Sequence, residues 1–317
     1  MNEINIIASV CMITYNHEKY IVQSIDSVLM QRTNFDYEIV IGEDCSTDKT
    51  REIVLEYKAK YTGRIKLLLQ EKNVGMMQNF IDTLRACNGK YIALLEGDDY
   101  WTDPLKLQKQ MDFLEANPEY GMISSDVNLI DENGQAIPDN NMVLKQRANY
   151  KSTVDFFDLL EVNHVNTLTV CARADLMKEL AGRVIRENLW FVYDHWFWLN
   201  ISLASKIIIF SEKTAAYRIS VNGVSRSKDF FKIRKPLVLQ DVIFRFFLYN
   251  GNKKINLEEM SIISNYIVET LLFSKLSIRQ KVTSFKLLYK YPVLFLLIIN
   301  SLFIKVYQKI RNISNNF

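Results

Sequence analysis

Carboxylate groups gather in one short segment of the chain, Glu96-Gly97-Asp98-Asp99. Adjacent like charges repel and raise each other's pKa unless a cation lies between them. Oxygen ligands suit Mg²⁺ or Mn²⁺, which characteristically bridge one or two carboxylates to the phosphates of a substrate. The segment therefore indicates either a metal site or, more simply, a solvated acidic turn before the helix that begins near Asp103-Pro104.

Two other segments offer polar groups after runs rich in Ile and Val. The first is Thr14-Tyr15-Asn16-His17-Glu18, in which Tyr15 either stacks on a nucleotide base or covers the edge of a sheet. The second is Glu43-Asp44. Because Ser46-Thr47-Asp48 can cap the next helix, Asp44 is left free to accept a hydrogen bond from a ligand.

Alternating strands and helices must position these segments. Hydrophobic runs and helical spacing predict strands over 4–13, 37–41, 65–69 and 91–95, and helices over 17–31, 47–61 and 76–86. This alternation predicts an α/β fold with a largely parallel sheet covered on both faces and right-handed crossovers. In such a sheet, ligands bind where the loops after the strands converge.

Beyond residue 100 the pattern is less regular. We expect helices over 104–116 and 194–204, strands over 121–130, 167–173, 207–210 and 214–219, a hairpin turn over 131–134, and helices from about residue 230 onward. The segments 138–153 and 176–192 give no clear pattern.

Several standard motifs are missing from the sequence. It has neither a G-x-G-x-x-G segment after the first strand nor a G-x-x-x-x-G-K-[ST] segment, so neutralisation of a phosphate would depend on a metal. The three histidines form no H-E-x-x-H, and no G-x-S-x-G occurs. These absences disfavour a dinucleotide enzyme, a zinc hydrolase and a serine hydrolase.

Composition narrows the class further. Of 317 residues, 49% are hydrophobic and 24% are charged, which excludes wholesale disorder. The net charge of +3 does not indicate a nucleic-acid partner. Four scattered cysteines predict reduced thiols on the cytosolic side of a membrane, and the first residues are typical of a strand, not of a signal peptide.

The basic residues are unevenly distributed. After Glu269 the chain has eight Lys and Arg residues and no acidic residue. Residues 1–269 therefore contain 31 of the 39 basic side chains and all 36 acidic ones. Lys290 and Lys305 bracket the apolar run 292–299, and their separation is about 22 Å in a helix, too short to span a bilayer core of about 30 Å. Residues 275–311 therefore form a membrane-surface anchor, a buried helix or a dimer contact.

The loop sequences TYNHEKYIVQSIDSVLMQ, IGEDCSTDKT, NVGMMQNF and YIALLEGDDYW, in this order, resemble the N-terminal half of a family 2 glycosyltransferase of the GT-A type. Asp194-His195-Trp196 and residues 217–225 are similar to acceptor-side motifs of that family. The resemblance covers residues 4–226. It implies a mixed, mostly parallel sheet flanked by helices, with a catalytic domain over 1–226 and a basic helical region over 227–317.

The resemblance also implies roles for individual residues. Asp194 matches the catalytic base, and Asp99, with Asp98, matches the ligands of Mn²⁺ or Mg²⁺. Acceptor-side positions are His195 and Trp196. Trp196 and Trp198 either stack on sugar faces or belong to the core, and Trp190 is a further candidate for stacking. The positions expected to bind the nucleotide-sugar donor are Thr14, Tyr15, Glu18, Asp44, Asn73 and Asp98.

This chain departs from the family pattern at two positions. Ser220 stands where the family commonly has His, which leaves a metal with fewer protein ligands. Tyr193 precedes Asp194 where a second acid is common, so the role of base depends on Asp194 alone.

The expected activity is inverting transfer of a sugar from a UDP-linked donor to a glycan or lipid-linked acceptor in surface polysaccharide synthesis. The chain would act in the cytoplasm or at the inner face of the cytoplasmic membrane. One rival is a nucleotidyltransferase, although the Gly-rich, basic first loop usual in that class is missing. The other is an inactive GT-A scaffold, which the intact Asp98, Asp99 and Asp194 disfavour and Ser220 slightly favours. The sugar, the linkage and the oligomeric state stay open.

Overall fold

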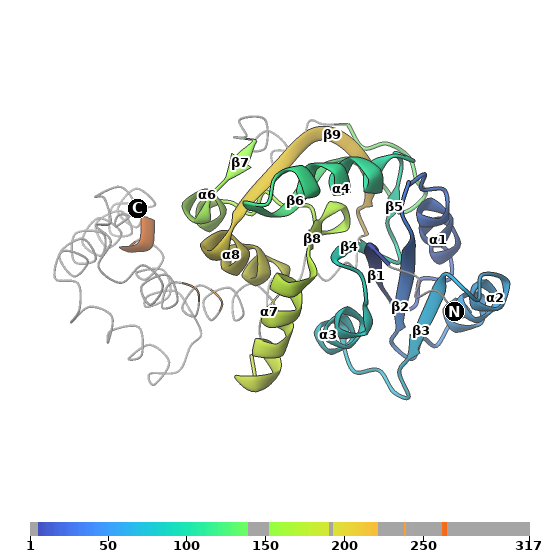
Figure 1. Ribbon diagram of the computed structural model, residues 1–317. Coiled ribbons are helices and arrows are strands. Elements are labelled where there is room, and N and C mark those ends of the chain that lie inside the picture. The colour runs from blue at the N-terminus through green and yellow to red at the C-terminus, as the bar shows by residue number, and fades with distance from the viewer. Residues whose placement is uncertain are drawn as a thin grey trace, which may run out of the picture. The chain divides into compact units, whose positions relative to one another are not determined.

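The computed structural model describes residues 6–138, 152–189 and 193–220, together with residues 238, 242 and 262–264 (Figure 1). Two compact units divide the chain. One comprises Met1–Asp155 and Asn163–Val221, and the other comprises Phe156–Val162, with the short helix α6 (Phe156–Glu161), and Asn222–Phe317. The predicted boundary after residue 226 and nearly all of the predicted helical region lie outside the described residues and stay predictions.

Half of the sheet is parallel. Strands β1 (Ala8–Thr14), β2 (Tyr37–Glu43), β3 (Ile65–Leu69) and β4 (Tyr91–Glu96) pair in the order β3-β2-β1-β4. Helices α1 (Ile21–Leu29), α2 (Thr50–Lys60) and α3 (Met76–Ala86) connect them, with α1 and α2 on one face and α3 on the other (Figure 1). Because both faces are covered, β1 and β2 are buried almost throughout, which explains their Ile- and Val-rich sequences.

The other half is mixed. The sheet continues β4-β8-β6-β9-β5, with β8 (Cys171–Arg173) antiparallel to β4 and to β6 (Tyr120–Ile130). Strand β9 (Lys206–Arg218) runs parallel to β6, and β5 (Tyr100–Trp101) and β7 (Thr153–Val154) run antiparallel to β9. Helices α4 (Lys106–Ala116), α7 (Ala174–Arg186) and α8 (Asp194–Ala204) complete the described part of this half. The predicted α/β class with a mostly parallel sheet is confirmed.

Three predictions about individual elements were incomplete or wrong. The two strands predicted over 207–210 and 214–219 are one strand, β9, because its pairing with β6 passes from Phe210 opposite Ser125 to Lys213 opposite Asp126 across a register shift. The strand predicted over 167–173 begins instead with a 3-10 turn, η2 (Thr167–Thr169), and only Cys171–Arg173 pairs in the sheet. Residues 176–192, which gave no pattern, contain most of α7.

The predicted hairpin after β6 is confirmed. Gly134 N donates to Asp131 O at 3.0 Å, Gly134 has φ +81°, and Ile130 forms an antiparallel bridge with Ala136. Within the described ranges, no helix combines the length and the apolar character needed to cross a bilayer. The predicted membrane-surface segment, residues 275–311, lies outside those ranges.

Candidate active site

The carboxyl ends of β1, β2 and β4 bring three of the predicted loops together. Thr14 is in register with Glu43, and Ile13 is in register with Glu96. Asp44 N donates to Thr14 O at 3.1 Å, and Gly97 N donates to Ile13 O at 2.9 Å. The predicted convergence of these loops at one sheet edge is therefore confirmed.

The loop after β1 is bonded to the start of α2. Lys49 N donates to Glu18 Oε2 at 3.0 Å, and Glu18 N donates to Asp48 Oδ2 at 3.0 Å. The Glu18 carboxylate thus orders the neighbouring loop. Tyr15 is 40% exposed, so its ring is accessible for stacking, whereas Thr14 is buried.

Asp44 is not free, contrary to the expectation from the sequence. Val74 N donates to its Oδ1 at 2.7 Å and Gly75 N donates to its Oδ2 at 3.0 Å, and Asp44 is only 2% exposed. The carboxylate thus fixes the loop that contains the exposed Asn73. Each bonded oxygen retains a further lone pair, so a role for Asp44 toward a donor stays a proposal.

The acidic segment is held largely out of water. Asp99 is 3% exposed, and burial, followed by the charges of Asp98 and Glu96, raises its pKa well above the ordinary value. Glu96 Oε2 is buried without a hydrogen-bond partner. Burial, the charge of Asp98 and then the charge of Asp194 raise the pKa of Glu96 to about 8. A buried carboxylate oxygen without a donor beside other acids is the environment in which a cation lowers the electrostatic cost.

These residues fit a cation that is shared with a diphosphate. Among the described residues, no three His, Cys, Asp or Glu side chains are arranged as a complete metal site. Mg²⁺ and similar ions, however, are commonly held by one or two carboxylates plus phosphate oxygens and water. Asp98, which is partly exposed, and Asp99 can supply such a pair.

Two residues that the sequence did not single out contact the acidic segment. His17 Nδ1 lies 3.2 Å from Thr14 Oγ1, and its Nε2 lies 3.9 Å from Asp98 Oδ2. Arg218, at the end of β9, donates from Nε to Asp98 O at 2.8 Å and from its backbone N–H to Asp99 Oδ1 at 2.6 Å. The available signal for Arg218 was its place in the motif 217–225, which was assigned to the acceptor side.

Asp194 begins α8 and is partly exposed. Thr167 Oγ1 donates to its Oδ2 at 2.6 Å, and His195 N donates to its Oδ1 at 2.7 Å. Its charge also contributes to the raised pKa of Glu96. The structure therefore brings the predicted base into the electrostatic neighbourhood of the acidic segment, although 98 residues separate Asp194 from Glu96 in the sequence.

The aromatic residues of α8 belong to the core. Trp196 is 0% exposed and packs against Phe197, with the Arg183 guanidinium 5.0 Å from its ring centroid, and Trp198 and His195 are buried as well. Of the two alternatives for Trp196 and Trp198, stacking on a sugar or membership of the core, the structure shows the second. Trp190 lies outside the described residues. Ser220, at the position where the family commonly has His, donates to Glu132 Oε1 at 3.1 Å.

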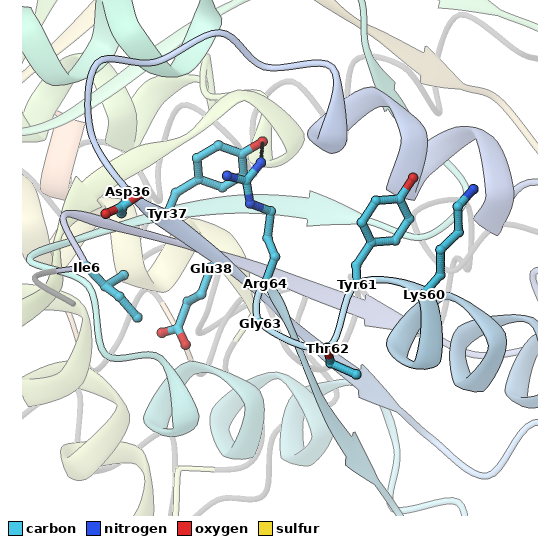
Figure 2. A pocket seen from close by; sticks show the side chains of 9 residues that line it. All are labelled: Ile6, Asp36, Tyr37, Glu38, Lys60, Tyr61, Thr62, Gly63 and Arg64. Carbon is cyan, nitrogen blue, oxygen red and sulfur yellow. Dashed lines mark hydrogen bonds between the residues drawn. The ribbon is translucent and has the colours of Figure 1, made fainter. Parts of the chain in front are cut away.

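A pocket of about 440 Å³ lies elsewhere, at the opposite edge of the sheet (Figure 2). It is lined by Tyr37 at the amino end of β2 and by Arg64 just before β3, and the guanidinium lies over the Tyr37 ring at 4.6 Å. Ligands of open α/β sheets bind at the carboxyl ends of strands, so this pocket is separate from the candidate site.

A mostly parallel sheet with an acidic segment and a nearby helix-borne carboxylate at its carboxyl edge defines the GT-A class of nucleotide-dependent transferases. The comparison with protein families identifies the family within this class. Residues 9–203 match the model of Glycosyl transferase family 2, and the chain belongs to that family, whose members invert the anomeric centre.

Two curated relatives illustrate the range of similarity. "Uncharacterized protein Rv1520" of Mycobacterium tuberculosis is 33% identical over 69% of this chain, and the chain spans only 60% of that relative's length. "UDP-Glc:alpha-D-GlcNAc-diphosphoundecaprenol beta-1,3-glucosyltransferase WfgD" of Escherichia coli is 29% identical over 70% of this chain and 81% of its own length.

Solved structures share the fold. TarS of S. aureus, in a complex with UDP-GlcNAc, superposes with a TM-score of 0.57 at 18% identity, covering 94% of this chain and 89% of that chain. The mannosyltransferase PcManGT of Pyrobaculum calidifontis, in a complex with GDP-Man and Mn²⁺, gives 0.53 at 14% identity, over 97% and 83%. Both likenesses support the GT-A architecture.

Proposed function

We propose that this protein transfers a hexose from a UDP-sugar to a glycan or lipid-linked acceptor, with inversion, in the synthesis of a surface polysaccharide. The observation that carries the proposal is the convergence of the loops after β1, β2 and β4 beside Asp98 and Asp99, in a chain whose residues 9–203 match Glycosyl transferase family 2. The acidic segment suits the donor side, and Asp194, which begins α8 and is partly exposed, suits the acceptor side.

The donor half of the proposed reaction uses the strand-end loops. Tyr15 stacks on the base, Asp44 keeps the adjacent loop in place, and Asn73 and Asp98 contact the rest of the donor. Asp98 and Asp99 would hold Mn²⁺ or Mg²⁺. When bound, the cation neutralises charge on the departing diphosphate.

The acceptor half depends on Asp194. An acceptor hydroxyl becomes a strong nucleophile only as a base removes its proton, and a carboxylate opposite the leaving group gives direct displacement with inversion. The partly exposed Asp194 has the accessibility that this step requires. Its two hydrogen bonds hold the carboxylate in one orientation.

The acceptor proposal draws on the relatives and on the tail. The name of WfgD gives its acceptor as a sugar linked to diphosphoundecaprenol, and such an acceptor would lie at a membrane. Eight basic residues and no acids after Glu269 would favour the anionic inner face of the cytoplasmic membrane. The proposed location is therefore cytoplasmic, with residues 275–311 at the membrane surface.

The test measures products from UDP-glucose and UDP-GlcNAc with Mn²⁺, both with water as the acceptor and with a membrane lipid extract. We expect release of UDP. A nucleotidyltransferase would instead convert UDP-glucose and added pyrophosphate into UTP and glucose 1-phosphate, so a parallel reaction with pyrophosphate separates the two classes. Asp194→Asn should lower kcat by about 10²- to 10⁴-fold, the usual contribution of a general base, while UDP still raises Tm. Asp112→Asn, a change of an exposed acid on α4, serves as the matched control.

Chelation of the metal and the variant Asp99→Asn test whether the reaction requires a cation held by Asp99. Both should abolish Mn²⁺-dependent UDP release. Full activity in excess chelator would refute the metal role. UDP release by Asp194→Asn at the wild-type rate would refute the assignment of the base. Formation of UTP and glucose 1-phosphate from UDP-glucose and added pyrophosphate, without release of UDP, would refute the glycosyltransferase.

A further inference from the structure

The hydroxyl of Thr167 makes a short hydrogen bond to the predicted base. Thr167 Oγ1 donates to Asp194 Oδ2 at 2.6 Å, a length typical of bonds to an ionised carboxylate. The other oxygen, Oδ1, accepts from His195 N at 2.7 Å. A carboxylate held at both oxygens has a fixed direction, whereas the backbone contact alone would leave the group free to turn about it.

Thr167 belongs to a turn that is itself rigidly held. In η2, Trp101 Nε1 donates to Leu168 O at 2.7 Å, and Gln110 Nε2 donates to Thr169 O at 2.8 Å. Just before it, Asn166 Nδ2 donates to Ser125 O at 2.9 Å. These bonds come from β5, α4 and β6, so each residue around Thr167 is fixed by a different element.

One of these hydrogen bonds, from Trp101 to Leu168, links the turn to the acidic segment. Trp101 follows Asp99 by two residues, is 1% exposed, and has its backbone N–H bonded to Ser27 Oγ at 3.0 Å. Its indole therefore connects β5, which follows the acidic segment in the chain, to η2. The backbone from Asp99 to Trp101, the hydrogen bond from Trp101 to Leu168 and the hydrogen bond from Thr167 to Asp194 together link the acidic segment to the predicted base.

We propose that Thr167 is a positioning residue that aims the Asp194 carboxylate at the acceptor hydroxyl. The inference rests on the proposed function, because it assigns Thr167 a role in the same transfer step. A misplacement of a catalytic group by about 1 Å can lower a rate about a hundredfold, so a single hydroxyl at this point matters for kcat. The donor loops lie on other elements, so KM for the donor should not depend on Thr167.

The experiment compares Thr167→Val, which keeps the shape and removes the hydroxyl, with Thr167→Ser, which restores it. The readout is Mn²⁺-dependent release of UDP from UDP-glucose or UDP-GlcNAc. We expect kcat to fall by about ten- to a hundredfold in Thr167→Val with KM for the donor changed less than about twofold. Thr167→Ser should recover kcat to within about threefold of wild type.

Thr83→Val controls for a purely structural effect. Thr83 Oγ1, buried in α3, donates to Asn79 O at 2.7 Å and belongs to neither η2 nor α8. This change should lower Tm while kcat per folded molecule is kept. If Thr167→Val behaved in the same way, or if Thr167→Ser failed to recover kcat, the positioning role would be overturned.

A second measurement decides the contact independently of turnover. The free energies of unfolding of Thr167→Val, Asp194→Ala and the double variant, from urea unfolding, form a cycle, in which residues in contact give non-additive changes. Additive changes would overturn the inference. A wild-type protein that released no UDP would count against the proposed function, and the cycle would still decide the Thr167–Asp194 contact.

Discussion

Arg218 N donates to Asp99 Oδ1 at 2.6 Å, although 119 residues separate the two in the sequence. The Arg218 side chain adds a bond from Nε to Asp98 O at 2.8 Å, and its guanidinium lies 4.2 Å from the centroid of the Tyr20 ring. The end of β9 therefore fixes the backbone of Asp98 and one carboxylate oxygen of Asp99. Because the bond from Arg218 N fixes the orientation of the Asp99 carboxylate, it also fixes the position of the second carboxylate oxygen, Oδ2.

Replacing Arg218 should loosen the acidic segment. Arg218→Lys keeps a positive charge and the backbone bond to Asp99 but loses the planar fork that reaches Asp98 O, the carbonyls of Asp131 and Glu132, and Gln23 Oε1. Since unpaired buried acceptors cost about 1–3 kcal/mol, we expect a loss of at least about 2 kcal/mol in the free energy of unfolding. Urea unfolding measures it.

The matched control for Arg218→Lys is Arg32→Lys, on an exposed residue, which should change the free energy of unfolding by less than about 0.5 kcal/mol. The Mn²⁺ concentration that gives half-maximal UDP release should rise only in Arg218→Lys. Equal stabilities of the two variants would show that the buried bonds of Arg218 do not hold the acidic segment.

The positions of the strand-end loops could be predicted from the sequence, because parallel strands with buried Ile and Val place their following loops at one edge. The predicted bounds of β3, α3 and α8 are the same as those in the structure. The roles of Arg218 and His17 could not be predicted, because they depend on which loops lie side by side after folding, and a single arginine has no local pattern that reveals its partners.

Glu96 should make the protein less stable as the pH rises. Its pKa in the folded state is about 8, whereas an unfolded glutamate titrates near 4.5. Between these values the folded state holds a proton that the unfolded state has released, so the free energy of unfolding falls with increasing pH. Below pH 4.5 and above pH 8 this group contributes no slope.

Glu96→Gln removes that titration. Without added metal, the decrease in Tm between pH 5 and pH 8 should be smaller in Glu96→Gln than in wild type, and the variant should gain stability relative to wild type toward pH 8. Glu115→Gln, which removes an exposed carboxylate paired with Lys90, controls for a general change in charge. Parallel Tm curves for wild type and Glu96→Gln would contradict the prediction.

Lys106 should have the opposite effect in a higher pH range. It is 0% exposed, its Nζ donates to Gln110 Oε1 at 2.8 Å and lies 4.1 Å from the Trp101 ring centroid, and burial lowers its pKa to about 7 from 10.5. Between pH 7 and pH 10.5 the unfolded state binds a proton that the folded state lacks, so stability rises with pH. Below pH 7 both states are protonated and the slope disappears.

Lys106→Met keeps the aliphatic length and cannot titrate. The rise in the free energy of unfolding between pH 7 and pH 9 should therefore be smaller in Lys106→Met than in wild type. Urea unfolding at several pH values measures the slope. Lys60→Met, on an exposed residue of α2, is the control, and it should leave the wild-type slope unchanged. An unchanged slope in Lys106→Met would mean that Lys106 is charged throughout this range in the folded state.

The least predictable parts of the site are the short turn η2 and helix α7. A three-residue turn has no periodicity, and Thr167-Leu168-Thr169 favours a strand on propensity alone, so only the bonds from Trp101 and Gln110 explain its shape. Helix α7 contains Gly182 and two basic side chains in its last turn, and the amphipathic pattern that it does have was not recognised from the sequence. Thr167 was missed because its significance depends on a turn that was predicted as a strand.

Gly97 should tolerate no side chain, because the loops after β1 and β4 approach each other closely there. A Cβ atom at Gly97 would lie 2.6 Å from Thr14 Oγ1 and 2.9 Å from His17 Nδ1. Gly97→Ala should therefore destabilise the fold by about 1–3 kcal/mol, as overpacking commonly does. It should also weaken UDP binding, because relieving the overlap moves the loop that carries Tyr15.

The control is Gly63→Ala, where no atom lies within 4 Å of the added Cβ and the effect on stability should be within about 1 kcal/mol of zero. Urea unfolding and the shift of Tm by UDP measure both effects, and wild-type values for Gly97→Ala would show that the two loops separate without cost.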